Sequence, residues 1–352
     1  MNPIAIRLLS QQLISPQFTK PEDVVAHMGA MQAQDYRMVR WAVAMRTKHP
    51  SFKAFRKTFD EGKIIRLHLL RGTWQLIAAE DYWWMLKLFA PKAKATLNGW
   101  MRANKILIDE KEEHAIREIL VEKVMESGSM TKKDFNVALQ ERGIEMDDHR
   151  LRYHLMLAEY SGTLCSGNLT SKETSYSLVE KKIKNRPPLM ERDEMLMLLA
   201  KKYFQSHAPA TFEDYIWWSG LSAAECRTGM ELLGNELRKE KWKGYDFYLL
   251  DGCRIKGFRK GKALLLPPYD EYLIGYKTRE LALTPHHVQH AHTNNGIFFP
   301  VIAENGIICG NWSPWKKTLQ TEYFDTEAKP LDLEKQWAKF SEIKKQAPCR
   351  MV

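Results

Sequence analysis

The sequence predicts an α+β protein that is mostly helical. Two observations predict this class. Segments with helical periodicity occur in three successive groups, and each group is followed by a short alternating run with a Gly-containing turn. After Asp251 the pattern changes to strand-like runs, and Asn305-Gly306 marks a hairpin turn among them. A chain of 352 residues is long enough to bury several hydrophobic cores.

Helical periodicity, prolines at first-turn positions and N-capping residues place the helices of the three groups. We expect these helices at about residues 3–14, 21 onward, 51–62, 110–127, 131–142, 147–160, 193–205, 211–219 and 222–240. Thr131 is the expected N-cap of its helix, and Ser222 with Glu225 has the spacing of a capping box. The amphipathic stretch at residues 331–345 predicts a terminal helix.

Three short hairpins follow the three helical groups. Alternating or turn-bounded runs predict them at residues 64–78, 162–178 and 242–250. The first is expected to turn at Arg71-Gly72 and the third at Lys243-Gly244. Three helices followed by a hairpin is the winged-helix order, in which the middle helices form a helix-turn-helix.

The repeated order predicts a division of the chain into four parts. Residues 1–108, 109–186 and 187–251 are expected to form three tandem winged-helix units. Residues 252–352 are expected to form a C-terminal β-rich piece, in which KALLLPPYDEYLIGY and GIFFPVIAENGIICGNW read as strands, followed by the terminal helix.

The distribution of charge indicates a polyanionic partner. The net charge is +10, and residues 1–75 hold twelve Lys and Arg against five Asp and Glu, so most of the excess lies near the N-terminus. A basic segment of this kind is typical of nucleic-acid binding, although a solvated basic surface would have the same composition.

Composition also indicates where the protein works. No apolar run is long enough to span a bilayer, and the N-terminus lacks the pattern of a secretory signal. The five cysteines are scattered and never form CxxC, which disfavours a disulfide framework or a cysteine zinc site. We therefore expect a cytoplasmic protein, associated with the nucleoid when bound to DNA, with no membrane partner and no cofactor.

Two uncharged amides stand out in the apolar stretch MGAMQAQDYRMVRWAVAMR, residues 28–46. On a continuous helix Gln32 and Gln34 would point about 200° apart and could not serve one site. If one helix ends near Gln34 and Asp35 caps the next, both amides can face one cleft. The alternative is that one glutamine is at the surface and the other satisfies a buried backbone group.

Basic residues near the glutamines are candidate DNA contacts. Arg37 and Arg40 are three apart, so on a helix they would share a face suited to phosphate. Arg66, His68 and Arg71 lie on the first hairpin, where alternation puts Arg66 and His68 on one face. These three could contact phosphate or support the cleft, or they could form a solvated wing.

Two other groups of residues invite a functional interpretation. PHHVQHAH places His286 and His290 four apart, a spacing that metal ligands use on helices, but no HExxH or fixed carboxylate accompanies them. We therefore expect no metal site. Adjacent carboxylates such as Asp270 and Glu271 usually point apart, so a structural role, such as bonding to a nearby Arg or Lys, is expected for them.

Four stretches together resemble a known family. MGAMQAQDYRMVRWAVAMR, RLHLLRGTWQLIAAEDYWWML, LPPYDEYLIGYKTR and NNGIFFPVIAENGIICGNW are similar, in this order, to the AlkZ-like winged-helix DNA glycosylases. The resemblance covers nearly the whole chain. It implies three tandem winged helices, a concave DNA-binding surface and a catalytic glutamine-x-glutamine motif at Gln32-Ala33-Gln34. Many members have proline where this chain has Tyr36.

The chemistry of amides fits this resemblance. Cleavage of a glycosidic bond passes through an oxocarbenium-like state that oriented dipoles can stabilise. An N-alkylated purine already carries positive charge, so its departure needs less help than that of a neutral base. The expected function is therefore a monofunctional DNA glycosylase that excises cationic alkylated purines, with bulky adducts and interstrand crosslinks as further candidate substrates. Damaged duplex DNA is the expected partner of a monomer.

Two other functions are compatible with the sequence. A winged-helix transcriptional regulator would also bind DNA, but such regulators usually carry one winged helix and a sensor or dimerisation domain. An inactive architectural DNA-binding paralogue would keep the fold without the reaction. An assay for excision of N7-methylguanine separates both from a glycosylase.

Overall fold

The computed structural model describes residues 2–171, 173–188, 190–325 and 331–346. Helices and small antiparallel sheets confirm the predicted α+β class. The chain forms two compact units. Unit 1 contains residues 1–55 and 191–352, and unit 2 contains residues 56–190. Among the described residues, no helix is both long enough and apolar enough to cross a membrane.

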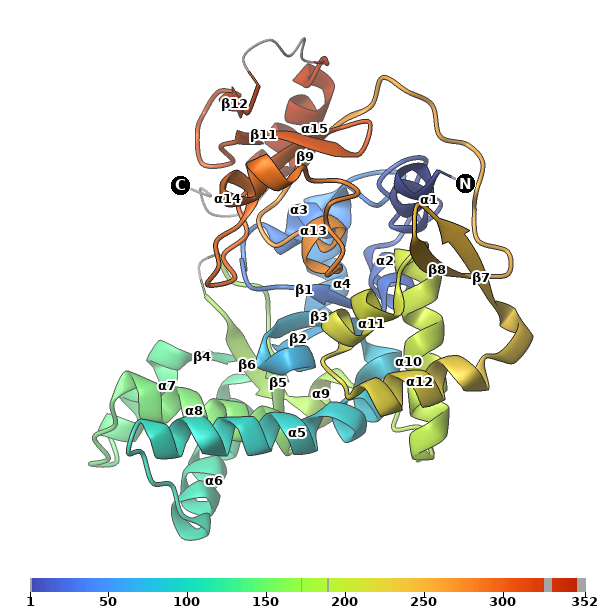
Figure 1. Cartoon of the computed structure of the whole chain (residues 1–352). Coiled ribbons are helices and arrows are strands. Elements are labelled where there is room, and N and C mark those ends of the chain that lie inside the picture. The colour runs from blue at the N-terminus through green and yellow to red at the C-terminus, as the bar shows by residue number, and fades with distance from the viewer. Residues whose placement is uncertain (1, 172, 189, 326–330, 347–352) are drawn as a thin grey trace. The chain divides into compact units, whose positions relative to one another are not determined.

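Unit 1 contains helices from both of its chain segments and two antiparallel sheets (Figure 1). Its helices are α1 (Pro3–Ser10), α2 (Pro21–Met28), α3 (Val39–Ala44), α10 (Arg192–His207), α11 (Phe212–Ser219), α12 (Ala223–Leu232), α13 (Glu271–Ile274), α14 (Val288–Ala291) and α15 (Glu334–Gln346). Its strands are β1 (Ala30–Gln32), β7 (Leu237–Trp242), β8 (Tyr245–Leu250), β9 (Ala263–Leu266), β10 (Val301–Glu304), β11 (Ile307–Trp312) and β12 (Thr321–Tyr323). The 3-10 turns Gly234–Glu236 and Pro285–His287 connect some of these elements.

The C-terminal sheet of unit 1 has the antiparallel order β12-β11-β10-β9. Asn305 and Gly306, both with positive φ, form the turn between β10 and β11, as predicted. Helix α15 packs onto this sheet through Phe340, whose ring lies 5.0 Å from that of Trp312 and 5.5 Å from that of Trp41. The predicted β-rich piece and terminal helix are therefore present, although LPPYDEYLIGY contains the helical turn α13 instead of a strand.

Unit 2 contains one hairpin and one small three-stranded sheet surrounded by helices. Its helices are α5 (Tyr82–Ala103), α6 (Glu110–Ser127), α7 (Lys132–Gln140), α8 (Asp148–Tyr160) and α9 (Val179–Lys182), and α4 (Phe52–Asp60) crosses the boundary between the units. Its strands are β2 (Ile64–His68), β3 (Trp74–Ala78), β4 (Met130–Thr131), β5 (Leu164–Ser166) and β6 (Ser175–Leu178), with 3-10 turns at Leu70–Gly72 and Ala79–Asp81. The sheet has the order β4-β6-β5.

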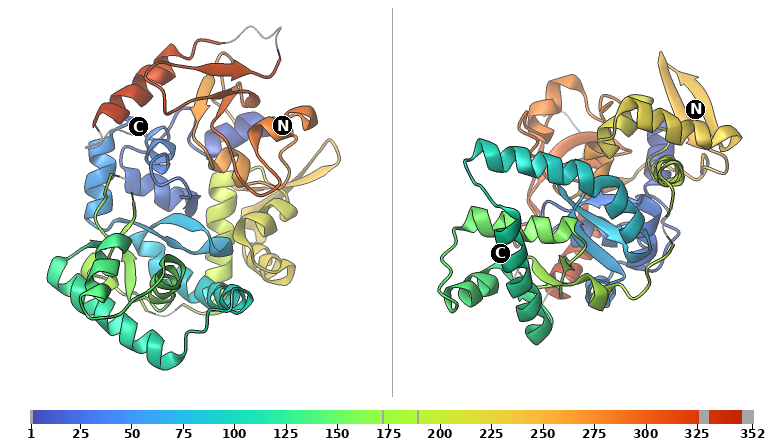
Figure 2. Two further views of the ribbon diagram at one scale, coloured as in Figure 1. Left: turned by 90° about the vertical axis from the view of Figure 1, so that its left-hand side faces the viewer. Right: turned by 90° about the horizontal axis from the view of Figure 1, so that it is seen from below.

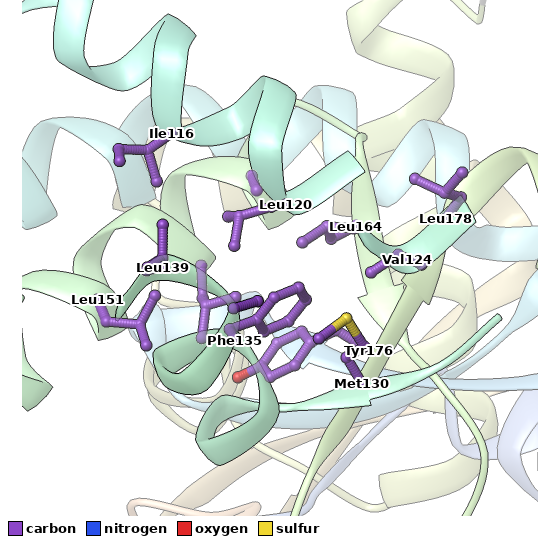
Figure 3. Packing of buried hydrophobic residues seen from close by; sticks show 13 residues of the cluster. Ile116, Leu120, Val124, Met130, Phe135, Leu139, Leu151, Leu164, Tyr176 and Leu178 are labelled. Carbon is purple, nitrogen blue, oxygen red and sulfur yellow. The ribbon is translucent and has the colours of Figure 1, made fainter. Parts of the chain in front are cut away.

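The core of unit 2 forms because helix α6 is apolar along one face. Ile116, Leu120 and Val124 recur at four-residue spacing, and all three are buried. They pack against Phe135 of α7 and Tyr176 of β6 in the cluster that Figure 3 shows. The long helix α5 runs alongside α8 and closes a second cluster with it (Figures 1 and 2). The sequence prediction did not include α5.

Local capping signals gave accurate helix starts. Thr131 is the N-cap of α7, and Ser222 forms the capping box of α12 with Glu225, as predicted. The predicted helix over residues 222–240 is too long, because α12 ends at Leu232 and the chain continues into β7.

The hairpin turn after β7 lies at Lys243-Gly244, as predicted. Both turn residues have positive φ, the conformation of a two-residue type I′ connection. The first hairpin, β2–β3, has a longer connection, and its 3-10 turn Leu70–Gly72 contains the predicted Arg71-Gly72.

Candidate active site and DNA-contacting residues

The glutamine motif begins at the last residue of a short strand and not on a helix. Helix α2 ends at Met28, and β1 begins one residue after Gly29. Gly29 has φ +75°, a conformation that residues with a side chain rarely adopt, and a Cβ there would lie 3.1 Å from the Cβ of Lys202. The expected continuation of the helix from residue 21 as far as Gln34 is therefore wrong, because α2 ends at Met28 and the next helix, α3, begins only at Val39.

The two glutamines lie where β1 ends and not on a helix, so the divergence of about 200° expected for residues two apart on a helix does not apply to them. Gln32, at the end of β1, is 6% exposed, and Gln34 beyond the buried Ala33 is exposed. Gln34 lies in a bend after the strand, and the contrast in burial is the one expected if one of the two glutamines is at the surface. A common cleft for the two amides stays a prediction.

Asp35 closes the turn that follows the motif. Its Oδ1 atom accepts hydrogen bonds from the backbone N–H groups of Arg37 and Met38, both at 2.9 Å. The prediction that Asp35 is the N-cap of the next helix is wrong, because Met38 is the N-cap of α3 and Asp35 instead caps the turn that precedes it.

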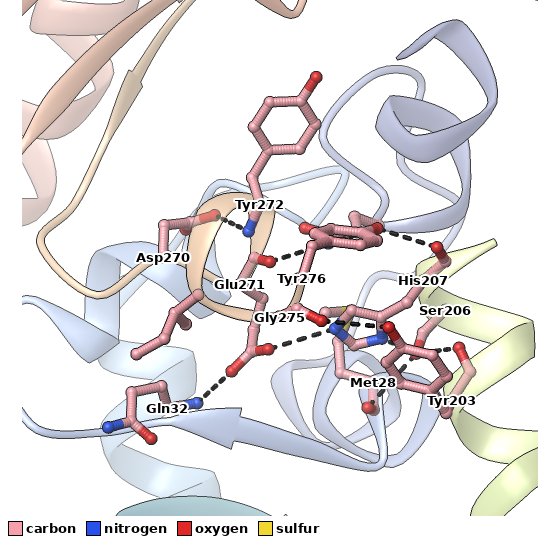
Figure 4. Close-up of polar contacts among 12 residues, drawn as sticks. Met28, Gln32, Tyr203, Ser206, His207, Asp270, Glu271, Tyr272, Gly275 and Tyr276 are labelled. Atoms are coloured by element: carbon pink, nitrogen blue, oxygen red, sulfur yellow. Dashed lines mark hydrogen bonds and ion pairs between the residues drawn. The ribbon is translucent and has the colours of Figure 1, made fainter. Parts of the chain in front are cut away.

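A buried carboxylate contacts the backbone of the motif. The N–H of Gln32 donates to Oε1 of Glu271 at 2.5 Å, and Oε2 of Glu271 lies 3.2 Å from Nε2 of His207 (Figure 4). Glu271 is 2% exposed. Sequence reasoning assigned Glu271 a structural role and did not connect it with the glutamines, because 239 residues separate it from Gln32.

His207 completes this arrangement as a neutral side chain. Burial lowers the pKa of His207 below its ordinary value, so the imidazole is uncharged at neutral pH. A carboxylate oxygen accepts hydrogen bonds, so Nε2 carries the proton and donates to Glu271. The other nitrogen, Nδ1, then accepts from the hydroxyl of Ser206 at 2.8 Å.

The turn that carries Glu271 is held by its neighbours. Oδ1 of Asp270 accepts from the N–H of Tyr272 at 2.9 Å and so caps α13. Arg46 donates to both oxygens of Asp270, at 2.8 and 2.9 Å. Gln11 donates to the backbone oxygen of Glu271 at 3.2 Å and accepts from Arg46 at 3.0 Å. The predicted structural role of Asp270, bonding to an arginine, is confirmed.

The two arginines after the motif have different environments. Arg37 is partly exposed, and its guanidinium lies 4.0 Å over the ring of Trp315. Arg40 is 2% exposed and lies over the rings of Tyr36 and Phe52. They do not share a helix face, because Arg37 precedes α3. Phosphate contact stays a prediction for both, and the burial of Arg40 favours a packing role.

The predicted hairpin residues lie in unit 2. The ring of Trp74 is 3.8 Å from the Arg66 guanidinium and 3.7 Å from the ring of His68, so the predicted common face of Arg66 and His68 is present. Both are buried, and Glu159 accepts from Nδ1 of His68 at 2.7 Å, so these two are not a solvated wing. Arg71 is partly exposed at the turn. DNA contact stays a prediction for all three.

The histidine-rich segment shows contacts with neighbouring side chains. His287 lies 2.8 Å from the Thr284 hydroxyl, His290 packs on Phe324, and the ring of His292 stacks on Phe298. Within the part of the chain that the structure describes, no three His, Cys, Asp or Glu residues are grouped as metal ligands.

Part of the basic excess near the N-terminus is internal. Four of the twelve Lys and Arg in residues 1–75 are buried, namely Arg7, Arg40, Arg46 and Arg66. Arg7 pairs with Asp214 at 3.1 Å within unit 1, as Arg46 does with Asp270. The positive surface that DNA could meet is therefore smaller than the sequence count implies.

Comparisons with known proteins agree with this fold. A curated relative from Streptomyces sahachiroi, named interstrand DNA cross-link repair glycosylase, is 24% identical over 348 residues, which cover 92% of this chain and 90% of the relative. The solved structure of Streptomyces sahachiroi DNA glycosylase AlkZ has a TM-score of 0.78 and 21% identity, covering 97% of this chain and 95% of that one. At this identity the likeness of the two structures establishes the fold.

The family comparison covers the parts of the chain described above. The family described as DNA glycosylase AlkZ-like matches residues 25–342, from within α2 to within α15. That range includes the glutamine motif, the β2–β3 hairpin and the turn that carries Glu271. The chain therefore belongs to the AlkZ-like family of DNA glycosylases.

Proposed function

We propose that the protein hydrolyses the N-glycosidic bond of cationic alkylated purines in damaged duplex DNA, with Gln32 and Gln34 as the catalytic pair. Family membership supports the reaction class. The name of the Streptomyces relative supports interstrand crosslinks among the substrates. Bulky adducts are a further candidate. The choice of a cationic base as substrate rests on one observation, which is that the side chains of Gln32 and Gln34 are uncharged amides.

Amides suit a leaving base that already carries positive charge. When an N7- or N3-alkylated purine departs, it leaves neutral and the sugar becomes an oxocarbenium-like cation. Amide oxygens can stabilise that cation as oriented dipoles and hold a water, which adds to the sugar and releases its proton to solvent. The Glu271 carboxylate that contacts the motif is buried with both oxygens hydrogen-bonded, so it does not act as the nucleophile.

The proposal includes the architecture and the partner. The element order α6, β4, α7, α8, β5, β6 with the sheet order β4-β6-β5 supports a winged helix in unit 2. Hairpins after α4 and after α12 support the other two winged-helix units and the predicted fourfold division. We further propose that the protein acts as a monomer in the cytoplasm, without a metal or organic cofactor.

The test is single-turnover excision from duplex DNA that contains N7-methylguanine, scored as abasic sites in a buffer with EDTA. We expect abasic sites from the wild-type protein. Gln32→Ala and Gln34→Ala should each slow excision by roughly 10- to 1,000-fold. The fold reduction in rate of the double variant should be smaller than the product of the two single reductions, because the two residues act as one unit. DNA affinity should barely change, because phosphate contacts dominate it.

A buried glutamine outside the motif provides the control. Gln12 is 3% exposed, and its amide donates to Leu9 O and accepts from the N–H of Gln17. Gln12→Ala should lower the melting temperature and keep the rate per folded molecule. Gln34→Asp, which introduces a carboxylate, should keep activity on cationic adducts. Full activity in the double Ala variant would overturn the catalytic assignment.

A further inference from the structure

We propose that Glu271 is the positioning residue of the glutamine motif: its carboxylate holds the backbone of Gln32 and so sets the direction of the catalytic amide. The proposal rests on the proposed catalytic role of Gln32. It assigns Glu271 no direct contact with the substrate.

The hydrogen bond to Gln32 is of a strong kind. A carboxylate that accepts from a backbone N–H forms a charge-assisted bond, and Gln32 N lies 2.5 Å from Oε1 of Glu271. Both residues are buried, so water does not compete for this N–H. Loss of this acceptor would remove a charge-assisted hydrogen bond from a buried N–H, and the backbone at Gln32 would lose the contact that fixes its direction.

The acceptor is itself fixed, which positioning requires. Oε2 of Glu271 is bonded to the neutral His207, and Gln11 bonds to the backbone oxygen of Glu271. The backbone at Gly275, which follows α13, also lies very close to His207. A Cβ at Gly275 would be 2.8 Å from Cδ2 of the His207 ring (Figure 4). Neither the carboxylate nor its turn can shift without breaking several of these contacts.

The contact acts on the end of the strand that presents the motif. Gln32 is the last residue of β1, and the chain leaves regular structure at Ala33. Farther along, the side chain of Asp35 accepts from the backbone N–H groups of Arg37 and Met38. A single Cα separates the held N–H from the side chain of Gln32, so rotation of this backbone redirects the amide.

The chemistry of the network makes Glu271→Gln an informative conservative variant. A glutamine Oε1 can accept from the Gln32 N–H as the carboxylate does. Its NH₂ group can donate to Nε2 of His207 once the imidazole proton moves to Nδ1. Ser206 then accepts from Nδ1 and donates to Lys202 O, which already lies 2.8 Å away. The variant therefore satisfies every partner and should fold.

The test compares three variants of Glu271 with the wild-type protein by single-turnover excision of N7-methylguanine, by DNA affinity and by thermal melting. Glu271→Met keeps the volume without an acceptor, and Glu271→Asp keeps the charge on a shorter side chain. Each should slow excision per folded molecule by about 10- to 100-fold, the loss expected from a misplaced catalytic group, with unchanged affinity. Glu271→Gln should stay within about fivefold of wild type, since a neutral acceptor is weaker but in place. If the Met variant does not fold, the Asp variant gives the same answer.

Asp214→Asn is the control for structural damage. Asp214 is a fully buried carboxylate of unit 1 that pairs with Arg7 and makes no contact with the motif. This variant should melt at a lower temperature and excise at the normal rate per folded molecule.

A double-mutant cycle identifies the residue through which Glu271 acts. In the Gln32→Ala background, Glu271→Met should slow excision further by less than about threefold, because the amide that Glu271 positions is already absent. Three outcomes would each overturn the inference. The slowing in the double variant could equal the product of the two single effects, the Met and Asp variants could excise at the normal rate, or the Gln variant could be as slow as the Met variant. Normal excision by Gln32→Ala would instead overturn the proposed function, and the inference with it.

Discussion

Arg46 and Asp270 form a buried ion pair with two hydrogen bonds, and side-chain exposures of 0% and 2%. Removing such charges from water is costly, and the bidentate contact offsets the cost. When one partner is deleted, the other charge stays buried without compensation. Asp270 holds α13 in place through its cap. Its buried charge is stable there only because Arg46 pairs with it.

Replacement of one partner should be strongly destabilising. We expect Arg46→Met to lower the free energy of unfolding by about 3–5 kcal/mol. The control is Lys201→Met, which removes an exposed pair with Glu236 in the same unit and should cost less than about 1 kcal/mol. Urea unfolding of both variants measures the difference, and equal small effects would show that the buried pair contributes no more than the exposed one.

At the scale of single elements, the sequence predicted the features that depend on neighbouring residues. Thr131 and Ser222 cap their helices through hydrogen bonds to residues three further on, and Lys243-Gly244 makes a turn from its own φ angles. The prediction failed where distant contacts decide. LPPYDEYLIGY has the aromatic and β-branched content of a strand, but Asp270 caps a helical turn that Arg46 secures from far along the chain.

The glutamine motif shows the same limit at the site. Its residues could be recognised from the sequence, because the spacing and the family resemblance are local. The conformation was predicted wrongly, because Ala and Met in MGAMQAQ favour helix by intrinsic propensity, whereas Gly29 ends α2 and the next residues are extended. The Glu271 contact lies 239 residues away, and no local pattern encodes it.

Helices α6 and α8 are joined by a contact that should respond to acid. The Arg150 guanidinium donates to Glu112 and holds the pKa of that carboxyl below its ordinary value of 4.5. A depressed carboxyl pKa contributes stability above the unfolded-state pKa, and this contribution is lost as pH falls through the lower, folded-state pKa. We therefore expect wild-type stability to fall below about pH 4.5 and the Glu112→Gln variant to lack this part of the decline.

Urea unfolding at several acid pH values measures that decline. Glu118→Gln, on an exposed side chain of the same helix, should keep the wild-type pH dependence. If Glu112→Gln showed an equally steep decline, the Arg150 contact would not be the cause.

For the whole molecule, the number of basic side chains available to DNA is smaller than the sequence suggests. The net charge is +10, but four arginines are buried, namely Arg7, Arg40, Arg46 and Arg66. Of the predicted DNA contacts in unit 1, Arg37 is the more exposed arginine. Replacing it with Ala should weaken binding to any sequence and reduce the slope of log affinity against log salt by about one.

Fluorescence anisotropy at several salt concentrations measures this slope. Arg40→Met serves as the comparison, since burial predicts an effect on melting temperature and an unchanged slope. An unchanged slope in the Arg37 variant would remove that residue from the interface.

Unit 1 is discontinuous in the chain, with residues 56–190 forming unit 2 between its two segments. This order has a consequence for synthesis on the ribosome, which proceeds from the N-terminus. The nascent chain exposes Arg7 and Arg46 long before Asp214 and Asp270 are translated, at separations of 207 and 224 residues. Unit 2 can complete its core first, whereas unit 1, which carries the glutamine motif, must wait for the second segment to leave the ribosome. High contact order of this kind slows folding, so unit 1 is the part of the nascent chain that depends most on protection from aggregation.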